Sequence, residues 1–274
     1  MIYTYSQLRR EPLSRRGIDK LLAVGTLRRA GRFFVSRTED DAVVEALALG
    51  LRPTCLTAAE HHGLWVPPGT GTHVYGRRRI ELPDEHIGHG WHRTWPEPSA
   101  IASPALLIEH ASRCLDPLDV GILADSALRQ GKLHENQVDA IRTRVPRPVS
   151  RVLARASAAA ESGTESKVRL YFQLRNIPVR TQVEIPGVGR VDLVVGRRWI
   201  IECDSKAHHT GESSYEYDRE RDGGALQLGY FTTRLTHRMV FAEWLRTQDR
   251  LEEITASRQH LVDPERARRA RRAR

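Results

Sequence analysis

The chain has 274 residues, of which 40% are hydrophobic and 28% charged, a balance typical of globular proteins that excludes an intrinsically disordered chain. A chain of this length usually forms more than one domain. It contains no apolar run of the roughly 18 residues that a membrane-spanning helix needs, and its first residues lack an apolar signal core, so we expect neither a membrane protein nor a secreted one. Its cysteines (Cys55, Cys114 and Cys203) lie far apart and fit neither a disulfide framework nor a zinc spacing, which indicates reduced thiols and a cytoplasmic protein.

The charge balance points to an anionic partner. Lysine and arginine total 43 against 34 acidic residues, a net charge of +9, and only four of the basic residues are lysines. Arginine offers a fork of donors that suits phosphate, although a GC-rich coding bias would also enrich it. Nucleic acid is therefore the favoured partner.

The first 38 residues predict a small DNA-binding unit. Ser6 is a candidate cap for a short helix, Ser14 for a second helix that Gly25 ends, and the segment TLRRAGRFFV alternates as a two-stranded wing would. This is the order of a winged helix-turn-helix, whose second helix enters the major groove. A generic helical cap with a solvated basic face would show the same pattern. The residues expected to contact DNA are Arg15, Arg16 and Lys20 on the second helix and Arg28 and Arg29 on the wing.

Residues 39–145 predict a small α/β core. We expect helices over 40–49, 55–64, 103–114 and 117–130 and short strands near 72–76 and 79–82. The run DEHIGHGWH spaces His86, His89 and His92 three apart, but nearby glycine and proline indicate a loop, and no cysteine or carboxylate completes an obvious metal tetrad. We interpret these side chains as loop histidines.

Composition also predicts a linker and a tail. Residues 146–160 mix proline, arginine and small side chains, which favours a linker between domains. Residues 256–274 end in ERARRARRAR, a disordered or helical basic tail that would add salt-dependent affinity for phosphate.

Residues 161–255 carry the clearest chemical signals. A helix is expected over 164–176, followed by three strands that the turns at 186–189 and 196–198 separate, and by a further helix over 216–228. The elements predict an α/β domain with a mixed sheet that begins at the hairpin of residues 179–195.

Three acidic side chains interrupt these apolar strands. Asp192 lies in the second strand, and Glu202 and Asp204, two residues apart in the third, point to one face. The hairpin can bring Asp192 beside them, and acids that converge in this way repel one another at neutral pH. A divalent cation would relieve that repulsion, so the pattern predicts Mg²⁺ (or Mn²⁺), which prefers carboxylate and water oxygens.

Further residues lie near this group in the sequence. Glu165, on the preceding helix, could hold the ion or a water beside it. His208 and His209 follow the third strand, where they could transfer a proton or contact phosphate.

These motifs resemble a known family of enzymes. The strings RVDLVV, IIECDSKAHH, YDRERD and LGYFTTRLT, in this order over about 80 residues, resemble the Vsr-like branch of the PD-(D/E)xK nucleases, the very-short-patch-repair endonucleases and their relatives. The resemblance implies a restriction-endonuclease-like mixed sheet flanked by helices. It also implies roles: metal ligands at Asp192 and Glu202, the helix acid at Glu165, the catalytic histidine at His208, and an orienting acid at Asp218 or Asp222.

One position departs from the family pattern. Where the superfamily usually has acid-x-lysine, Glu202 is followed by Cys203 and Asp204, so the basic role would pass to Lys206 or a histidine, or be dispensed with. The first 140 residues resemble the winged-helix region and following core of AbiEi-type antitoxins. We therefore expect a metal-dependent DNA endonuclease with an N-terminal DNA-binding region. A catalytically inactive DNA-binding regulator is the alternative, and the sequence predicts neither the oligomeric state nor a protein partner.

Overall fold

The computed structural model describes the chain except residues 11–12, 77–80, 92–96, 98, 205–211 and 273–274. The chain divides into two compact units. Unit 1 comprises residues 1–116 and 136–146, and unit 2 comprises residues 117–135 and 147–274. The described part contains helices and three mixed or antiparallel sheets, which confirms the α/β class. No helix in the described part is both long and apolar enough to cross a membrane.

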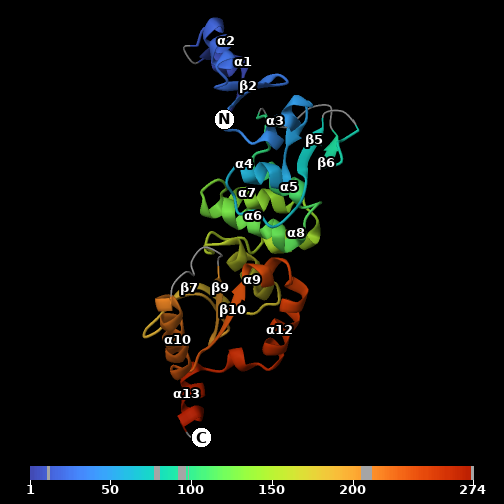
Figure 1. Ribbon diagram of the computed structural model, residues 1–274. Coiled ribbons are helices and arrows are strands. Elements are labelled where there is room, and N and C mark those ends of the chain that lie inside the picture. The colour runs from blue at the N-terminus through green and yellow to red at the C-terminus, as the bar shows by residue number, and fades with distance from the viewer. Residues whose placement is uncertain (11–12, 77–80, 92–96, 98, 205–211, 273–274) are drawn as a thin grey trace. The chain divides into compact units, whose positions relative to one another are not determined.

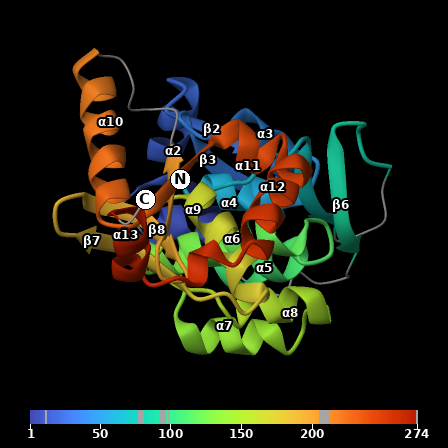
Figure 2. The same cartoon turned by 90° about the horizontal axis from the view of Figure 1, so that it is seen from below.

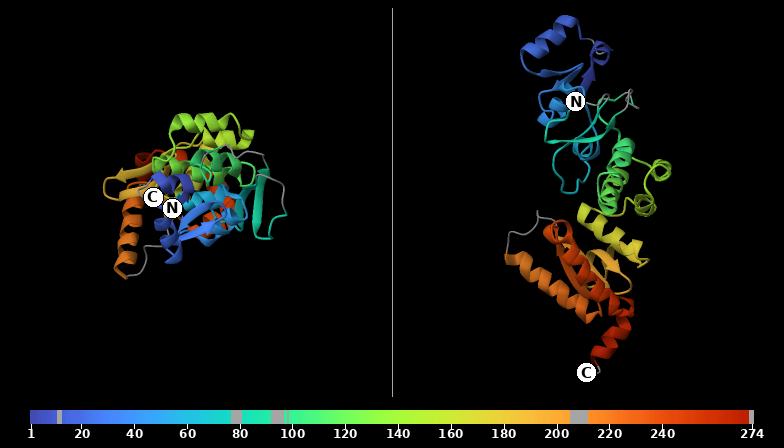
Figure 3. Two further views of the ribbon diagram at one scale, coloured as in Figure 1. Left: turned by 90° about the horizontal axis from the view of Figure 1, so that it is seen from above. Right: turned by 90° about the vertical axis from the view of Figure 1, so that its right-hand side faces the viewer.

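Unit 1 begins with helices packed on a small sheet (Figure 3). The elements are β1 (Ile2–Thr4), α1 (Tyr5–Arg10), α2 (Arg15–Ala23), β2 (Leu27–Ala30) and β3 (Phe33–Ser36), and the antiparallel sheet has the order β1-β3-β2. The two expected helices and the two expected strands are therefore present, with β1 as an additional strand. Buried apolar side chains from α1, α2, β2 and β3 form the core of this part (Leu8, Ile18, Leu27 and Phe34).

Local capping explains where these helices begin and end. Ser14 caps α2 as predicted, because its hydroxyl accepts a hydrogen bond from the backbone N–H of Gly17 at 3.1 Å. The predicted cap of α1 is wrong: α1 begins before Ser6, and the Thr4 hydroxyl accepts from the N–H of Gln7 at 3.2 Å. Gly25 ends α2 at φ 72°, a left-handed conformation that glycine adopts without steric cost.

The rest of unit 1 is a second three-stranded sheet with helices. It contains α3 (Asp41–Ala48), β4 (Arg52–Pro53), α4 (Cys55–His61), β5 (Thr72–Gly76), β6 (His86–Trp91), α5 (Pro104–Ala111) and most of α7 (Glu135–Arg142). The sheet order is β4-β5-β6, in which β4 is antiparallel and β6 parallel to β5. The expected helices and the strand at 72–76 are confirmed.

The structure corrects the interpretation of the histidine run as a loop. His86 and His89 lie on strand β6, not in a loop, and His92 lies outside the described residues. Glycine lowers the local preference for a strand, but pairing with β5 overrides it. Of the strand expected near 79–82, residues 79–80 lie outside the described part and residues 81–82 form no strand.

Unit 2 is built on a four-stranded mixed sheet. The strands are β7 (Val179–Ile185), β8 (Gly189–Val195), β9 (Trp199–Asp204) and β10 (Phe231–Thr236), in the order β10-β9-β8-β7. β10 is parallel to β9, and the other neighbours are antiparallel. Helix α10 (Glu212–Gln227) covers one face, and α9 (Gly163–Leu174), α11 (His237–Phe241) and α12 (Trp244–Ala256) cover the other (Figures 1 and 2).

Helix α6 (Pro117–Arg129) belongs to unit 2 because it packs closely against α9. Arg169 of α9 forms a buried ion pair with Asp125 of α6 at 2.5 Å. A methyl group at Gly121 would lie 2.5 Å from a Leu170 side-chain carbon, so a larger residue there would force that side chain to move.

The segments expected as linker and tail both contain helices. The first, 146–160, includes α8 (Arg147–Leu153), which buries Val149, Val152 and Leu153, and proline is tolerated in its first turn. The second, 256–274, includes α13 (Pro264–Arg272), so the basic tail is helical over that range.

Candidate active site

Asp192 and Glu202 lie on neighbouring strands of the unit 2 sheet. The β8–β9 pairing of Leu193 with Ile201 and of Val194 with Ile200, continued by one residue, sets Asp192 opposite Glu202. At this point side chains replace the backbone hydrogen bonds between the strands. Oε2 of Glu202 accepts a hydrogen bond from the N–H of Asp192 at 3.1 Å, and Oδ2 of Asp192 accepts one from the N–H of Cys203 at 2.8 Å. The hairpin connection between the strands therefore brings the two acids together, as the sequence predicted.

Glu202 forms an ion pair with an arginine. Its side chain is 11% exposed, and Oε1 accepts from Arg221 of α10 at 3.0 Å. Burial raises the pKa of Glu202 and the charge of Asp192 raises it further, whereas the N–H of Asp192 and the charges of Arg221 and Arg234 act in the opposite direction.

Glu165 has a structural role at the start of α9. Ser162 caps the helix by accepting from the N–H of Glu165, and its hydroxyl donates to Oε1 of Glu165 at 2.9 Å. The sequence Ser-x-x-Glu is that of a capping box, although here the N–H of Glu161 donates to Oε2 at 3.0 Å. Glu165 is 4% exposed, and burial together with the charge of Asp192 raises its pKa.

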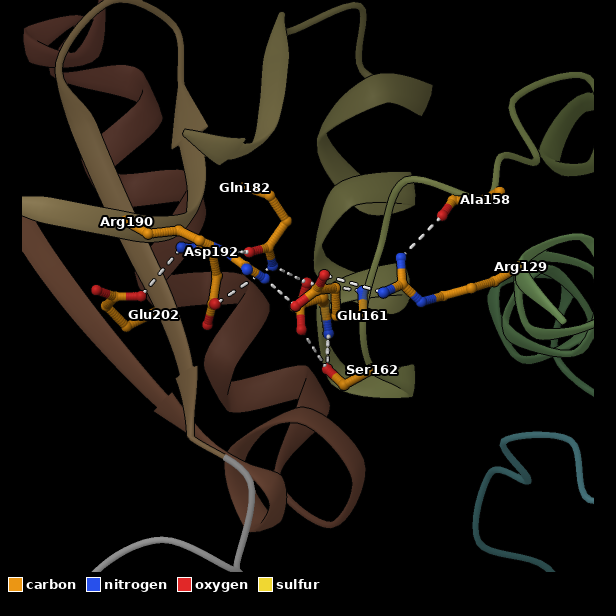
Figure 4. A network of polar contacts seen from close by, with 9 residues as sticks. Arg129, Ala158, Glu161, Ser162, Gln182, Arg190, Asp192 and Glu202 are labelled. Carbon is orange, nitrogen blue, oxygen red and sulfur yellow. Dashed lines mark hydrogen bonds and ion pairs between the residues drawn. The ribbon is translucent and has the colours of Figure 1, made fainter. Parts of the chain in front are cut away.

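Gln182 joins Glu165 to Asp192 and was not predicted from the sequence. Its side-chain nitrogen donates to Oε2 of Glu165 at 2.8 Å and lies 3.5 Å from Oδ1 of Asp192. Gln182 has φ 50°, which is rare for a residue other than glycine and is often found where a side chain must be aimed. Figure 4 shows Gln182 beside Asp192, with Glu202 on the other side of Asp192. An amide in an amphipathic strand gives no distinctive sequence signal.

The donors of this group suit a hard cation. Carboxylate oxygens are the ligands that Mg²⁺ prefers. However, among the described residues no three carboxylates each bring an oxygen within 4.8 Å of the others. Asp192 and Glu202 are the pair that would hold such a cation, and Glu165 contacts Asp192 through Gln182. We call Asp192, Glu202 and Glu165 the acidic site.

The remaining predicted catalytic residues are only partly covered by the described structure. Asp222, on α10, forms an ion pair with Arg234 of β10 at 3.1 Å. Asp204 ends β9, and Asp218 lies in α10, but their side chains are outside the described part. Three further residues lie in the segment 205–211, which is outside it entirely: Lys206, His208 and His209.

The basic residues of α2 and β2 differ in how they are engaged. Arg15, Arg16 and Lys20 are exposed on α2 and form no ion pair with any residue that the structure describes. Arg28 pairs with Asp41 at 2.6 Å and donates to the carbonyl of Glu39, whereas Arg29 is exposed and lies over the ring of Phe34. The three α2 residues therefore offer the more available positive charge.

A second group of ligand-type side chains lies in unit 1, and it was not predicted from the sequence. Cys55, His73, His89 and Cys114 each place one ligand atom within 4.8 Å of the others. Sequence reasoning missed this group, because spacing along the chain does not report distance in the fold. We call these four residues the Cys/His cluster.

Comparisons with known proteins add no relative. No family model matches the chain, and no curated protein and no solved structure is similar enough to count as a match.

Proposed function

We propose that this protein is a metal-dependent DNA endonuclease that hydrolyses phosphodiester bonds, with the acidic site as its active site. One observation carries the proposal: helix α9, the strands β7 to β9, helix α10 and the parallel strand β10 set Asp192 opposite Glu202 on adjacent strands. A mixed sheet flanked by helices is also what the sequence resemblance implies, and it supports the proposal.

The residues of the site have distinct proposed roles. Asp192 and Glu202 would hold Mg²⁺ or Mn²⁺, which would offset the charge that develops on the phosphate oxygens. Glu165 fixes the start of α9 and, through Gln182, holds Asp192 in place. Arg221 balances the charge of Glu202 in the absence of a cation. His208, or alternatively His209, would transfer a proton to the leaving oxygen, with Asp218 or Asp222 orienting it.

The N-terminal unit would supply DNA affinity. The exposed α2 side chains Arg15, Arg16 and Lys20 support this role, because such charges neutralise phosphates without choosing a sequence. Arg28 and Arg29 on the wing are secondary contacts in this proposal. Reduced thiols are consistent with a cytoplasmic protein.

Supercoiled plasmid tests the proposal directly. Purified protein is incubated with plasmid and Mg²⁺, Mn²⁺ or no added metal, and nicked and linear products are measured. We expect cleavage with Mg²⁺ or Mn²⁺, and expect Asp192→Asn to reduce it to the level without protein while DNA binding is kept or tightened, since one negative charge is lost. Glu184→Gln, on the exposed side of β7, is the matched control and should cut normally. An Asp192→Asn protein that cuts at the wild-type rate would overturn the proposal.

A proton-transfer role for His208 has its own expected size. Removing a general acid usually costs about 10²–10⁴-fold in rate. His208→Ala should therefore slow cleavage by that range without changing the Mg²⁺ concentration needed for half-maximal rate. A shift in that concentration instead would assign His208 to metal binding.

The alternative is a DNA-binding regulator that keeps the fold and does not cut. One observation favours it: the carboxylates of the acidic site are already hydrogen-bonded by backbone N–H groups, Gln182 and Arg221. Specific DNA binding without nicking under any of the metal conditions would support this alternative.

A further inference from the structure

The Cys/His cluster gathers four residues from separate elements of unit 1. Cys55 is the first residue of α4, His73 lies on β5, His89 lies on β6, and Cys114 follows α5. Cys55 is fully buried and His73 is 2% exposed, whereas Cys114 lies at the exposed edge. A cluster with one open edge gives a metal ion access from solvent.

The sulfur–nitrogen distance in the cluster matches that between two ligands of one tetrahedral ion. Sγ of Cys114 lies 3.7 Å from Nδ1 of His73. With zinc–sulfur and zinc–nitrogen bonds of about 2.3 and 2.1 Å, the edge between sulfur and nitrogen in a tetrahedron is about 3.6 Å. Nδ1 of His73 and Nε2 of His89 are 2.9 Å apart, a hydrogen-bond distance that would open slightly around an ion.

Two irregularities of the backbone aim these side chains at one point. On β6 the pairing with β5 shifts by one residue between Val74 and Gly76, so that His89 and Gly90 oppose the single residue Tyr75. Such bulges redirect a side chain and recur beside functional sites. Cys55 has φ 47°, in the left-handed region that residues with a Cβ avoid. Two ligands from different elements are thus turned toward the same place.

Neighbouring groups hold the imidazoles in position. The ring of His89 hydrogen-bonds the backbone of His110, the kind of outer contact that orients metal-binding histidines. His110 is itself fixed, because its Nδ1 lies 2.7 Å from the Thr54 hydroxyl and its ring stacks on Tyr75 at 5.0 Å. The N–H of His73 donates to the Thr57 hydroxyl at 2.8 Å, which ties β5 to α4.

We propose that Cys55, His73, His89 and Cys114 bind one Zn²⁺ ion as a structural site of unit 1. Two thiolates and two imidazoles form a standard tetrahedral zinc set, whereas Mg²⁺ requires oxygen ligands. Four protein ligands leave no position for a substrate, so the site is structural and joins α4, β5, β6 and the segment after α5. The ion binds as the two thiols release their protons. This site does not depend on the proposed nuclease activity.

The first experiment measures metal in the full-length protein. The chain is purified without an affinity tag and without chelator, and its metal content is determined by mass spectrometry. We expect one zinc per chain. After exchange for Co²⁺, we expect the visible bands of tetrahedral cobalt and a thiolate-to-cobalt charge-transfer band. Wild-type protein that holds no zinc and gives no such bands would overturn the proposal, as would an intact mass showing a Cys55–Cys114 disulfide.

Matched variants identify the ligands. Cys114→Ser and His89→Asn should lose the bound zinc, and Cys114→Ser should also lose charge-transfer intensity. Cys203→Ala, in unit 2, and His86→Asn, on the same strand as His89, should each keep one zinc per chain. Cys114 is at the exposed edge, so its variant is the one that tolerates substitution best. If the control variants lose zinc and the cluster variants keep it, the ion is bound elsewhere.

Melting temperature provides an independent measurement. A strong chelator should lower the melting temperature of the wild-type protein and of Cys203→Ala, because zinc binds the folded state only. The same chelator should leave Cys114→Ser unchanged. Equal sensitivity of wild type and Cys114→Ser would contradict a role for the cluster.

Discussion

The acidic site of unit 2 and the Cys/His cluster of unit 1 differ in what their ligand atoms contact. In the acidic site, the carboxylates of Asp192 and Glu202 accept hydrogen bonds from backbone N–H groups, and Arg221 pairs with Glu202. In the Cys/His cluster, the ligand atoms face one another, as the 2.9 Å and 3.7 Å separations at His73 show. The carboxylates of the acidic site have partners without an ion, so we propose that this site needs an ion only for chemistry. The Cys/His cluster would need an ion for its structure. If the protein has the proposed activity, its loss in a chelator would therefore have two separable causes.

Adding back one metal at a time tests this difference between the two sites, and it has the largest expected effect of the experiments below. Protein stripped of all metal should neither cut plasmid nor keep its melting temperature. Zn²⁺ alone should restore the melting temperature, and only the further addition of Mg²⁺ should restore cleavage. If Zn²⁺ alone restores full cleavage, the two sites do not divide the roles of structure and chemistry in this way.

The buried pair of Arg169 and Asp125 tests the metal-independent part of this difference, because it joins α9, the helix that carries Glu165, to α6 without a metal. Removing one partner of a buried ion pair usually costs about 3–5 kcal/mol, since the other charge stays buried and unpaired. Arg169→Met should lower the free energy of unfolding of unit 2 by that amount, equally with and without Zn²⁺, as measured by denaturant titration. Arg175→Met, which breaks the exposed pair with Glu252, is the control and should have little effect.

DNA affinity should depend on unit 1 charges and not on the acidic site. Reversing Arg15, Arg16 and Lys20 to glutamate should weaken DNA binding and reduce the slope of log affinity against log salt by about 0.9 for each phosphate that the variant no longer neutralises. Changing Arg28 alone should weaken binding less, because Asp41 already pairs with it. An unchanged affinity and salt slope in the triple variant would favour a protein-binding role for this helix.

Lowering the pH should change the free energy of unfolding of the two units in opposite directions. This is the smallest of the expected effects. In unit 1, Glu39 is buried, which raises its pKa, but hydrogen bonds from the Met1 amine and His61 outweigh burial and lower the pKa below 4.5. The stability that Glu39 contributes is therefore present above pH 4.5 and is lost as the pH falls through its folded pKa.

In unit 2, burial raises the pKa of Glu165 and Glu202 above 4.5. The folded protein then binds protons that the unfolded chain does not, so stability without metal falls as the pH rises from 4.5 through the folded pKa. Each full unit of difference is worth about 1.4 kcal/mol. Glu165→Gln should flatten the dependence of unfolding free energy on pH in that window, whereas Glu39→Gln should flatten it only below pH 4.5. The same slope in both variants would contradict this assignment.

How far the sequence predicted the fold depends on how local each signal is. The cap at Ser14, the helix end at Gly25 and the turns that separate β7, β8 and β9 each depend on a few consecutive residues, and all were predicted. The predicted cap at Ser6 was wrong because Thr4 competes for the same turn. The expected loop at His86 and His89 was wrong because pairing with β5 outweighs the weak strand preference of a glycine-rich segment.

The acidic site and the Cys/His cluster differ in the same way, because local signals predict one and not the other. The sequence by itself determined that Asp192 and Glu202 would meet, because short turns join their strands and leave almost no freedom in the pairing. Only the tertiary structure decided that Gln182 links Asp192 to Glu165, that α6 packs on α9, and that Cys55, His73, His89 and Cys114 converge. Those contacts join residues separated by long stretches of chain, and their geometry depends on loop closure, on a bulge in β6 and on the packing of whole elements. No periodicity or local spacing in the sequence predicts these contacts.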